Sequence, residues 1–507
     1  MPFSRSVSAL AVMTAMLGTP VFADLTADDV WADWQAYMKG FGYDMRGAQT
    51  RSGDTLKVRD VVMQQVLADD QGMFQIKMDV LTFVETGDGA VRVDLPSDMP
   101  IAFDMKPIEG PSISGQILYS QDTPSMVVTG DVSDLTYTYS ANGLTVSMDG
   151  LTMDGVAMPA EAFRMRADLR DVANVTRIKS GALRDYSQDL TAGAVTYDVT
   201  FDIPDPEAGK GFLRGTATNL QSDWSGTLPD DIDAATDLGA MIEAGFDVRG
   251  SVTFDGGTSE VDMLTPDGPF ALNTSSQGGA VRVGMGTAGL SYDFNYDQVS
   301  ATAKVAEFPF PVTVGLGKFA FKLQAPVQQV DTEQDFALGL TLGDFTISEV
   351  IWNLFDPAAQ LPRDPATIAL DLTGKAKILL DFLNPDIAQT LKPNQMPAEV
   401  NSVTLNNLQI SAAGADLTGM GAFSFDNTDT NSFGGVPKPS GALDLRLQGA
   451  NGLIDSLVKM GLLPEDQAMG ARMMMGLFTV PQGDDVLSSK IEVNDQGHVL
   501  ANGQRLR

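Results

Sequence analysis

The side chains that could do chemistry are very unevenly represented in this chain. It contains one histidine, His498, and no cysteine, which excludes thiolate nucleophiles, thiolate metal sites and metal sites built from several histidines. A Ser-His-Asp triad would have to use His498. Carboxylates number 66, and two of them flanking a cleft could hydrolyse a glycosidic bond, but no pair stands out. We therefore assign no catalytic residue.

Two motifs could hold a ligand. GMGTAG (Gly284–Gly289) matches a dinucleotide loop, but the alternating LSYDFNYD that follows predicts a strand where that loop needs a helix, so a β-turn is favoured. In DNTDTNSFGG, Asp429 and Asn431 have the spacing of a calcium loop, yet Ser440 occupies the position of its bidentate acid. We assign no cofactor-binding and no metal residue, and expect no cofactor.

Four methionines form a third candidate site. Thioether sulfurs can coordinate soft copper ions, whereas methionines at helical spacing more often form an adaptable core or a hydrophobic docking face. The residues are Met469, Met473, Met474 and Met475. An adaptable core or a hydrophobic docking face is therefore favoured over a copper site.

A hexapeptide occurs twice, as GYDMRG (Gly42–Gly47) and as GFDVRG (Gly245–Gly250). Shifting the chain by 203 positions aligns Met38–Val58 with Met241–Val261, with identical residues at nine of 21 positions. Such a common offset predicts an internal duplication.

Each copy of the hexapeptide has the features of a helix–strand corner. Its first glycine suits the left-handed position after a helix, its Asp and Arg lie two apart on one face of a strand and can pair, and its second glycine permits a bulge or a close approach. The glycines are Gly42, Gly245, Gly47 and Gly250, and the pairs are Asp44–Arg46 and Asp247–Arg249. A carboxylate–guanidinium site used twice is the functional alternative.

Composition limits the partners and the architecture. The 507 residues predict two or more domains. A net charge of −33 disfavours nucleic acid and anionic membrane surfaces as partners. The acidic residues are 54 Asp and only 12 Glu, accompanied by 50 Gly, a composition that favours many turns joining many short strands.

The first residues resemble a secretory signal peptide. Arg5 precedes the apolar segment Ser6–Pro20, and Val21–Ala23 matches the small-residue rule for cleavage. A membrane anchor needs about 20 apolar residues, and Pro20 interrupts the segment earlier. We predict cleavage after Ala23, a periplasmic location and no transmembrane span in the mature chain.

The predicted fold class is mainly β with some α: two tandem repeats, each a helix followed by a long antiparallel β-meander, and a helical C-terminal cap. Helices are expected in TADDVWADWQAYMKG with Thr26 as cap, over Leu228–Gly245, between Ser348 and Pro357, and on both sides of Pro464. The linker candidate is Phe425–Gly441. The expected segments are the signal peptide 1–23, repeat one 24–226, repeat two 227–440, and the helical segment with a final hairpin 441–507.

Three stretches resemble a family of exported bacterial proteins called domain of unknown function 2125. They are WADWQAYMKGFGYDM, LPRDPATIALDLTG and IEVNDQGHVLANGQRL, and the resemblance spans nearly the whole mature chain. It implies a Gram-negative envelope location and supplies no activity or catalytic residue. The chain is also similar, by analogy alone, to large envelope proteins with long antiparallel sheets, some of which handle lipids.

A sheet with one apolar face must cover that face. We therefore expect a non-catalytic periplasmic protein that binds an apolar, lipid-like ligand or an envelope partner. One alternative is a hydrolase of envelope polymers that uses Asp and Glu, and another is a structural or adhesion module stabilised by calcium.

Overall fold

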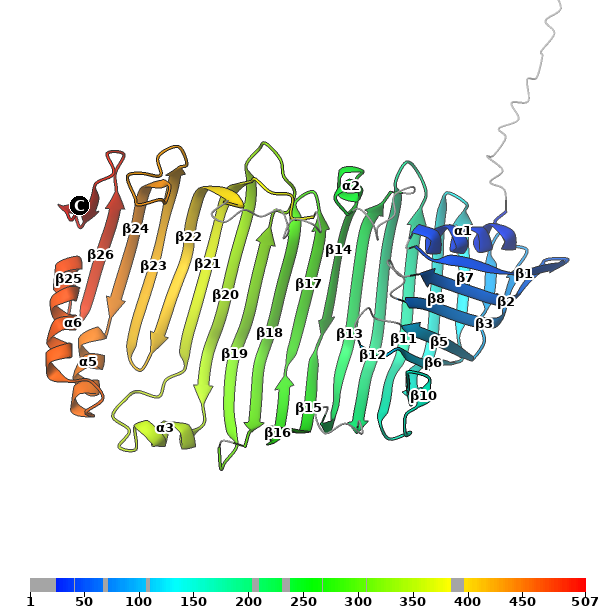
Figure 1. Cartoon of the computed structure of the whole chain (residues 1–507), viewed down its shortest axis with the longest axis horizontal. Helices are drawn as coiled ribbons and strands as arrows, with labels where there is room; N and C mark the ends of the chain where they lie inside the picture. Colours follow the sequence, from blue (N-terminus) through cyan, green and yellow to red (C-terminus); the bar gives the residue numbers. More distant parts are fainter. Residues whose placement is uncertain are drawn as a thin grey trace, which may run out of the picture.

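The computed structural model describes residues 24–40, 42–66, 72–105, 110–202, 209–229, 238–266, 268–306, 308–383 and 396–507. The expected signal peptide, residues 1–23, lies outside this part. The structure is 65% strand and 11% helix and forms one large antiparallel sheet of 28 strands, which Figure 1 shows as a single elongated layer.

The helices are α1 (Ala27–Gly40), α2 (Leu238–Glu243), α3 (Glu349–Phe355), α5 (Ala450–Lys459) and α6 (Glu465–Phe478). The strands are β1 (Asp44–Ser52), β2 (Thr55–Val66), β3 (Gly72–Glu85), β4 (Val91–Asp94), β5 (Asp98–Met105), β6 (Ile113–Asp122), β7 (Ser125–Asp131), β8 (Asp134–Asp149), β9 (Thr152–Met153), β10 (Val156–Ala157), β11 (Phe163–Lys179), β12 (Arg184–Asp202), β13 (Lys210–Leu228), β14 (Asp247–Phe254), β15 (Gly256–Thr265), β16 (Gly268–Ser276), β17 (Gly278–Gly286), β18 (Gly289–Lys304), β19 (Val312–Ala325), β20 (Gln334–Ile347), β21 (Ala366–Ile378), β22 (Ala398–Ala412), β23 (Ala415–Asp426), β24 (Lys438–Gln448), β25 (Val480–Gly483), β26 (Val486–Val493), β27 (Val499–Ala501) and β28 (Gln504–Arg505). No helix in the described ranges is long and apolar enough to cross a bilayer.

The N-terminal strands form a compact unit beneath α1. Helix α1 contacts β1, β2 and β3, and in Figure 1 these blue strands run across the direction of the long strands that follow. Val30 and Trp31 of α1 are buried against Val58, Leu81 and Phe83 of the strands. The protein's main hydrophobic core therefore lies at this end.

From β11 onward the long strands pair with their neighbours in a continuous antiparallel series (Figure 1). Next to β13, one position of the series is shared by two short strands. One half of β13 pairs with β15, and the other half pairs with β14. Several strands contain a single residue with positive φ, a left-handed position inside the strand. These residues include Asp171 (φ 53°), Asn219 (φ 50°), Gln298 (φ 48°) and Asp344 (φ 51°).

The predicted fold class was wrong in its repeat architecture. The sheet is continuous, and strands that follow the two hexapeptides pair differently: β1 pairs with β2, whereas β14 pairs with β13 and β17. The expected boundaries after residues 226 and 440 fall inside β13 and β24, and the division into segments stays a prediction. The repeated hexapeptide is a shared local corner without a shared topology.

The predictions for that corner are confirmed in both copies. Gly42 (φ 80°) donates its N–H to the Lys39 carbonyl at 2.9 Å, and Gly245 (φ 105°) donates to the Ile242 carbonyl at 3.1 Å. The ion pairs Asp44–Arg46 and Asp247–Arg249 form at 3.8 and 3.2 Å. The register shifts at Gly47, and a Cβ at Gly250 would meet the Trp224 ring at 2.3 Å. These contacts confirm the corner, and the carboxylate–guanidinium site used twice stays a hypothesis.

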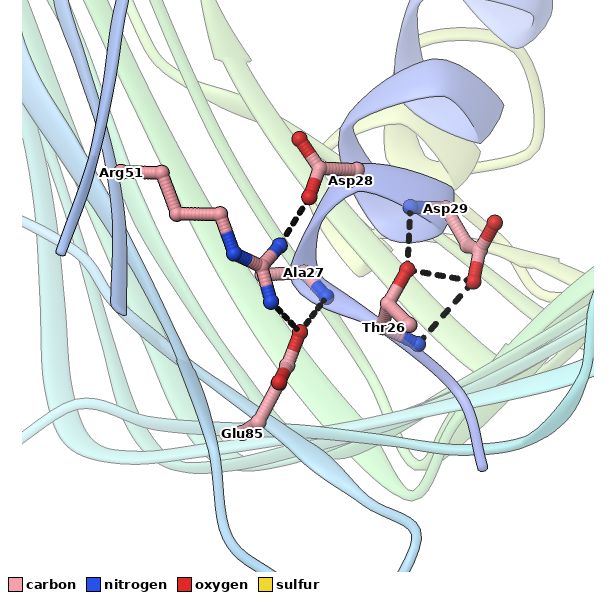
Figure 2. Close-up of polar contacts among 6 residues, drawn as sticks. All are labelled: Thr26, Ala27, Asp28, Asp29, Arg51 and Glu85. Atoms are coloured by element: carbon pink, nitrogen blue, oxygen red, sulfur yellow. Dashed lines mark hydrogen bonds and ion pairs between the residues drawn. The ribbon is translucent and has the colours of Figure 1, made fainter. Parts of the chain in front are cut away.

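The start of α1 is fixed by charged and polar contacts, as Figure 2 shows. Asp29 donates its N–H to the Thr26 hydroxyl at 3.2 Å, and Thr26 donates its own N–H to the Asp29 carboxylate at 3.0 Å, which confirms the expected cap. Arg51 pairs with Asp28 and, at 2.6 Å, with Glu85, whose carboxylate also accepts the Ala27 N–H at 2.9 Å. The helix is thereby tied to β1 and β3.

Other local predictions had mixed outcomes. The turn in GMGTAG is confirmed as a hairpin, and the expected final hairpin is confirmed with its turn at Asn502–Gly503. The helices on both sides of Pro464 are confirmed as α5 and α6. Of the helix predicted over Leu228–Gly245, Leu238–Glu243 is confirmed as α2 and Leu228 belongs to β13, whereas residues 230–237 lie outside the described part of the chain. The expected linker Phe425–Gly441 is the connection of the β23–β24 hairpin, because those strands pair directly.

The helix expected between Ser348 and Pro357 is confirmed as α3, and its end contains a buried carboxylate. Asp356 accepts the N–H groups of Gln360 and Leu361 at 2.8 and 2.9 Å. These backbone hydrogen bonds hold the pKa of Asp356 below its ordinary value. The role of Asp356 is structural, since it closes the corner between α3 and β21.

Candidate functional site

The long sheet separates apolar from polar side chains on its two faces. Successive residues of a strand point to opposite faces, and residues directly opposite each other on paired strands share a face. One row of such partners is Val281, Phe294, Phe321, Leu340, Leu370 and Leu408. A second row is Val283, Tyr292, Leu323, Leu338, Leu372 and Leu405. A third is Tyr296, Phe319, Leu342, Ile368 and Ile410. We call the surface formed by these three rows the apolar face.

The opposite surface is charged and hydrophilic. One row across it is Asp223, Ser251, Arg282, Asp293 and Lys322. Arg282 lies 3.6 Å from Asp293, and Arg214 lies 2.8 Å from Glu260. These exposed ion pairs are typical of a solvated sheet surface.

The apolar face differs from a core because its large side chains are not buried. The largest fully buried side chains of the described residues, all but Ile242 and Asp356, precede residue 136. Phe294, Phe321 and Leu340 are only half-buried, and Ile368 and Ile410 are exposed. The extensive contacts between a helix and the sheet are those of α1 with β1–β3 and of α5 with β23. No described helix therefore covers the middle of the apolar face.

The area of this face is large for an uncovered surface. The three rows cross six neighbouring strands, and with about 4.8 Å between strands and about 7 Å between same-face residues they span roughly 400 Å². Leu417, Leu445 and Leu447 extend the same face over β23 and β24, which brings it to roughly 530 Å². That is the upper end of the largest apolar patches on monomeric proteins, and such patches commonly mark binding sites.

The apolar face contains a hollow beside Gln298, whose backbone is left-handed (φ 48°). Its volume is about 600 Å³, within the range of small-molecule sites. The lining includes Tyr197, Phe254, Tyr296, Val299, Leu316 and Phe319 together with six Ser and Thr residues, and it contains no charged residue. The rings and aliphatic side chains can contact an apolar ligand, and the hydroxyls can hydrogen-bond to a polar group on it.

A buried ion pair lies where α1 packs against the sheet. Arg184 of β12 pairs with Asp33 of α1, and both side chains are about nine-tenths buried. The Tyr137 hydroxyl donates to Asp33 at 2.6 Å, and burial, reinforced by the Asp33 charge, raises the pKa of Tyr137. These three groups connect α1 to β8 and β12.

His498 and the aspartates of the calcium-like loop, which the sequence offered as candidates, do not form a catalytic or metal centre in the described part of the chain. His498 lies in the β26–β27 connection, where its N–H donates to the Asn494 side chain at 3.0 Å. Asp426 and Asp429 accept hydrogen bonds from Thr428 and Ser432, which lower the pKa of both carboxyls. Within the described ranges, no three His, Cys, Asp or Glu side chains are grouped to hold a metal ion.

Comparison with known proteins identifies a family. Residues 249–501, about half of the chain, match the family model described as "Uncharacterized protein conserved in bacteria", domain of unknown function 2125. The chain belongs to this family. No curated protein and no solved structure matches it.

The matched region is narrower than the sequence resemblance implied. It contains LPRDPATIALDLTG and most of the closing stretch, but WADWQAYMKGFGYDM lies before it. It runs from β14 to β27 and so includes the three rows of the apolar face. The part of the chain that aligns with this family is the part with the apolar face, and the buried core beneath α1 lies outside the match.

Proposed function

We propose that this protein binds a long apolar, lipid-like ligand along the apolar face, without catalysing a reaction on it. The observation that carries the proposal is the set of large apolar side chains on β17–β22, aligned in rows and left half-exposed. Leaving such a surface in water is unfavourable by about 25 cal/mol per Å² of apolar area. A ligand that covers it recovers that free energy.

The chemistry of the surface defines the ligand class. No charged side chain belongs to the three rows, so a charged headgroup would lose its hydration there without compensation. The ligand's chain should therefore lie over the rows while its polar end stays at the rim of the sheet. The periplasmic location expected from residues 1–23 remains part of the proposal, and an exported chain that begins at Asp24 by mass spectrometry would support it.

Paired substitutions on opposite faces provide a matched test. Phe294 and Phe321 are directly opposite on the apolar face, and their chain neighbours Asp293 and Lys322 are directly opposite on the polar face. We expect the double variant Phe294→Gln/Phe321→Gln to bind a fluorescent fatty acid at least tenfold more weakly. Loss of about 60 Å² of buried contact per ring corresponds to about 1.5 kcal/mol, or about tenfold in affinity.

The control variant Asp293→Asn/Lys322→Gln keeps the net charge and changes the same two strands. It should bind the fatty acid as the wild-type protein does, as measured by fluorescence titration and displacement with unlabelled palmitate. Equal weakening in both variants, or no binding by the wild-type protein, would contradict the proposal.

A further inference from the structure

A second apolar surface lies on α6, at the C-terminal end of the molecule (Figure 1). A helix on a globular protein ordinarily turns its apolar side toward the core. In α6 the only buried residue is Ala468, while four large apolar side chains face solvent. They are Met469 (66% exposed), Met473 (66%), Met474 (55%) and Leu477 (57%). We call these four residues the methionine patch.

The patch has the geometry of a helix-binding surface. Met469, Met473 and Leu477 are spaced four residues apart and therefore form one line along the helix. Methionine side chains are flexible and polarisable, so they adapt to different apolar partners. Arg472 pairs with Asp455 of α5, so this cation is directed at the neighbouring helix, while the four patch residues stay exposed.

Charge determines which partner fits. Residues 450–486 contain five acidic and two basic residues, a net charge of −3, in a chain whose net charge is −33. A second copy of this chain would therefore be repelled. Helices that lie in membrane interfaces carry Lys and Arg on their polar side and use aromatic anchors, whereas α6 contains a single Arg and has Glu465 and Asp466 in its first turn. A partner with basic residues around an apolar stripe complements both the acidic charge of this region and the apolar surface of the methionine patch.

We propose that the methionine patch docks an amphipathic helix of a partner protein whose apolar residues are flanked by Lys or Arg. This surface is separate from the three rows of the apolar face, so the inference does not depend on the proposed function.

The test uses the full mature chain with ¹³C-methyl-labelled methionine and a synthetic leucine–lysine helical peptide as the probe. We expect the methyl signals of Met469, Met473 and Met474 to shift on binding, and a leucine–glutamate peptide to bind at least about tenfold more weakly. The variant Met473→Gln/Leu477→Gln should lose at least about tenfold in affinity for the leucine–lysine peptide. Met420→Gln, which changes an equally exposed methionine (62%) on β23, should lose none.

Three outcomes would overturn the inference. If the double variant binds the leucine–lysine peptide as tightly as the wild type does, binding of the peptide depends on net charge alone and not on the methionine patch. If phosphatidylcholine vesicles or a second copy of the chain shift the patch signals while the peptide does not, the occupant is a membrane or a dimer. If neither peptide shifts these signals, the patch does not dock a helix.

Discussion

Replacing Phe83 by Ala is expected to lower the free energy of unfolding by about 3–5 kcal/mol, the usual cost of removing a buried aromatic side chain. Phe83 is fully buried and lies edge-on to Trp31 and Trp34, with ring centroids 6.1 and 5.4 Å away. Urea unfolding followed by tryptophan fluorescence measures the change directly, because two of the chain's four tryptophans touch this ring.

The matched control is Phe321→Ala on the apolar face. Its ring is half-exposed in the folded ligand-free protein, so its removal should cost only about 1 kcal/mol. If Phe321→Ala destabilises the protein as much as Phe83→Ala, the apolar face is covered in the free protein and cannot be an open binding surface.

Replacing Arg184 by Met is expected to cost about 3–5 kcal/mol, because Asp33 then remains buried without its cation. Adding Asp33→Leu should recover most of that loss, since a buried ion pair and well-packed apolar residues often have similar stability. Chemical denaturation of the two variants and the wild type gives both values.

An exposed ion pair provides the comparison for this prediction. Arg282 and Asp293 are 54% and 37% exposed, so Arg282→Met should change stability by less than about 1 kcal/mol. Equal losses in the Arg184 and Arg282 variants would show that the contact between α1 and the sheet does not depend on the buried pair.

Local features could be predicted from the sequence because short-range physics determines them. Thr26 caps α1, Gly42 and Gly245 end helices, and Asn502–Gly503 closes a hairpin, each through contacts with near neighbours in the chain. The same locality explains the incorrect duplication. Two helix ends can share a hexapeptide because both need a left-handed glycine and then polar residues where the chain leaves the helix. The strands beyond the two hexapeptides nevertheless pair differently.

The candidate site could not be found by reading one strand at a time. Alternation in LSYDFNYD indicates that Tyr292 and Phe294 share a face, but only the pairing registers show that Phe294 is opposite Phe321 and that Phe321 is opposite Leu340. Gln298 is left-handed (φ 48°), and Tyr296 and Val299, three residues apart on either side of that position, line the same hollow, so a simple period of two fails there. Aspartate in this chain occupies left-handed positions inside strands, as at Asp171 and Asp344, as well as turns.

Photocrosslinking of the full mature chain with a diazirine-labelled fatty acid tests the central claim most directly, because mass spectrometry then maps where the ligand lies. We predict adducts on apolar-face residues of β18–β21, including Phe294, Phe321 and Leu340, with competition by unlabelled palmitate. Adducts confined to α6 or to the polar face, or adducts that palmitate does not displace, would contradict the account.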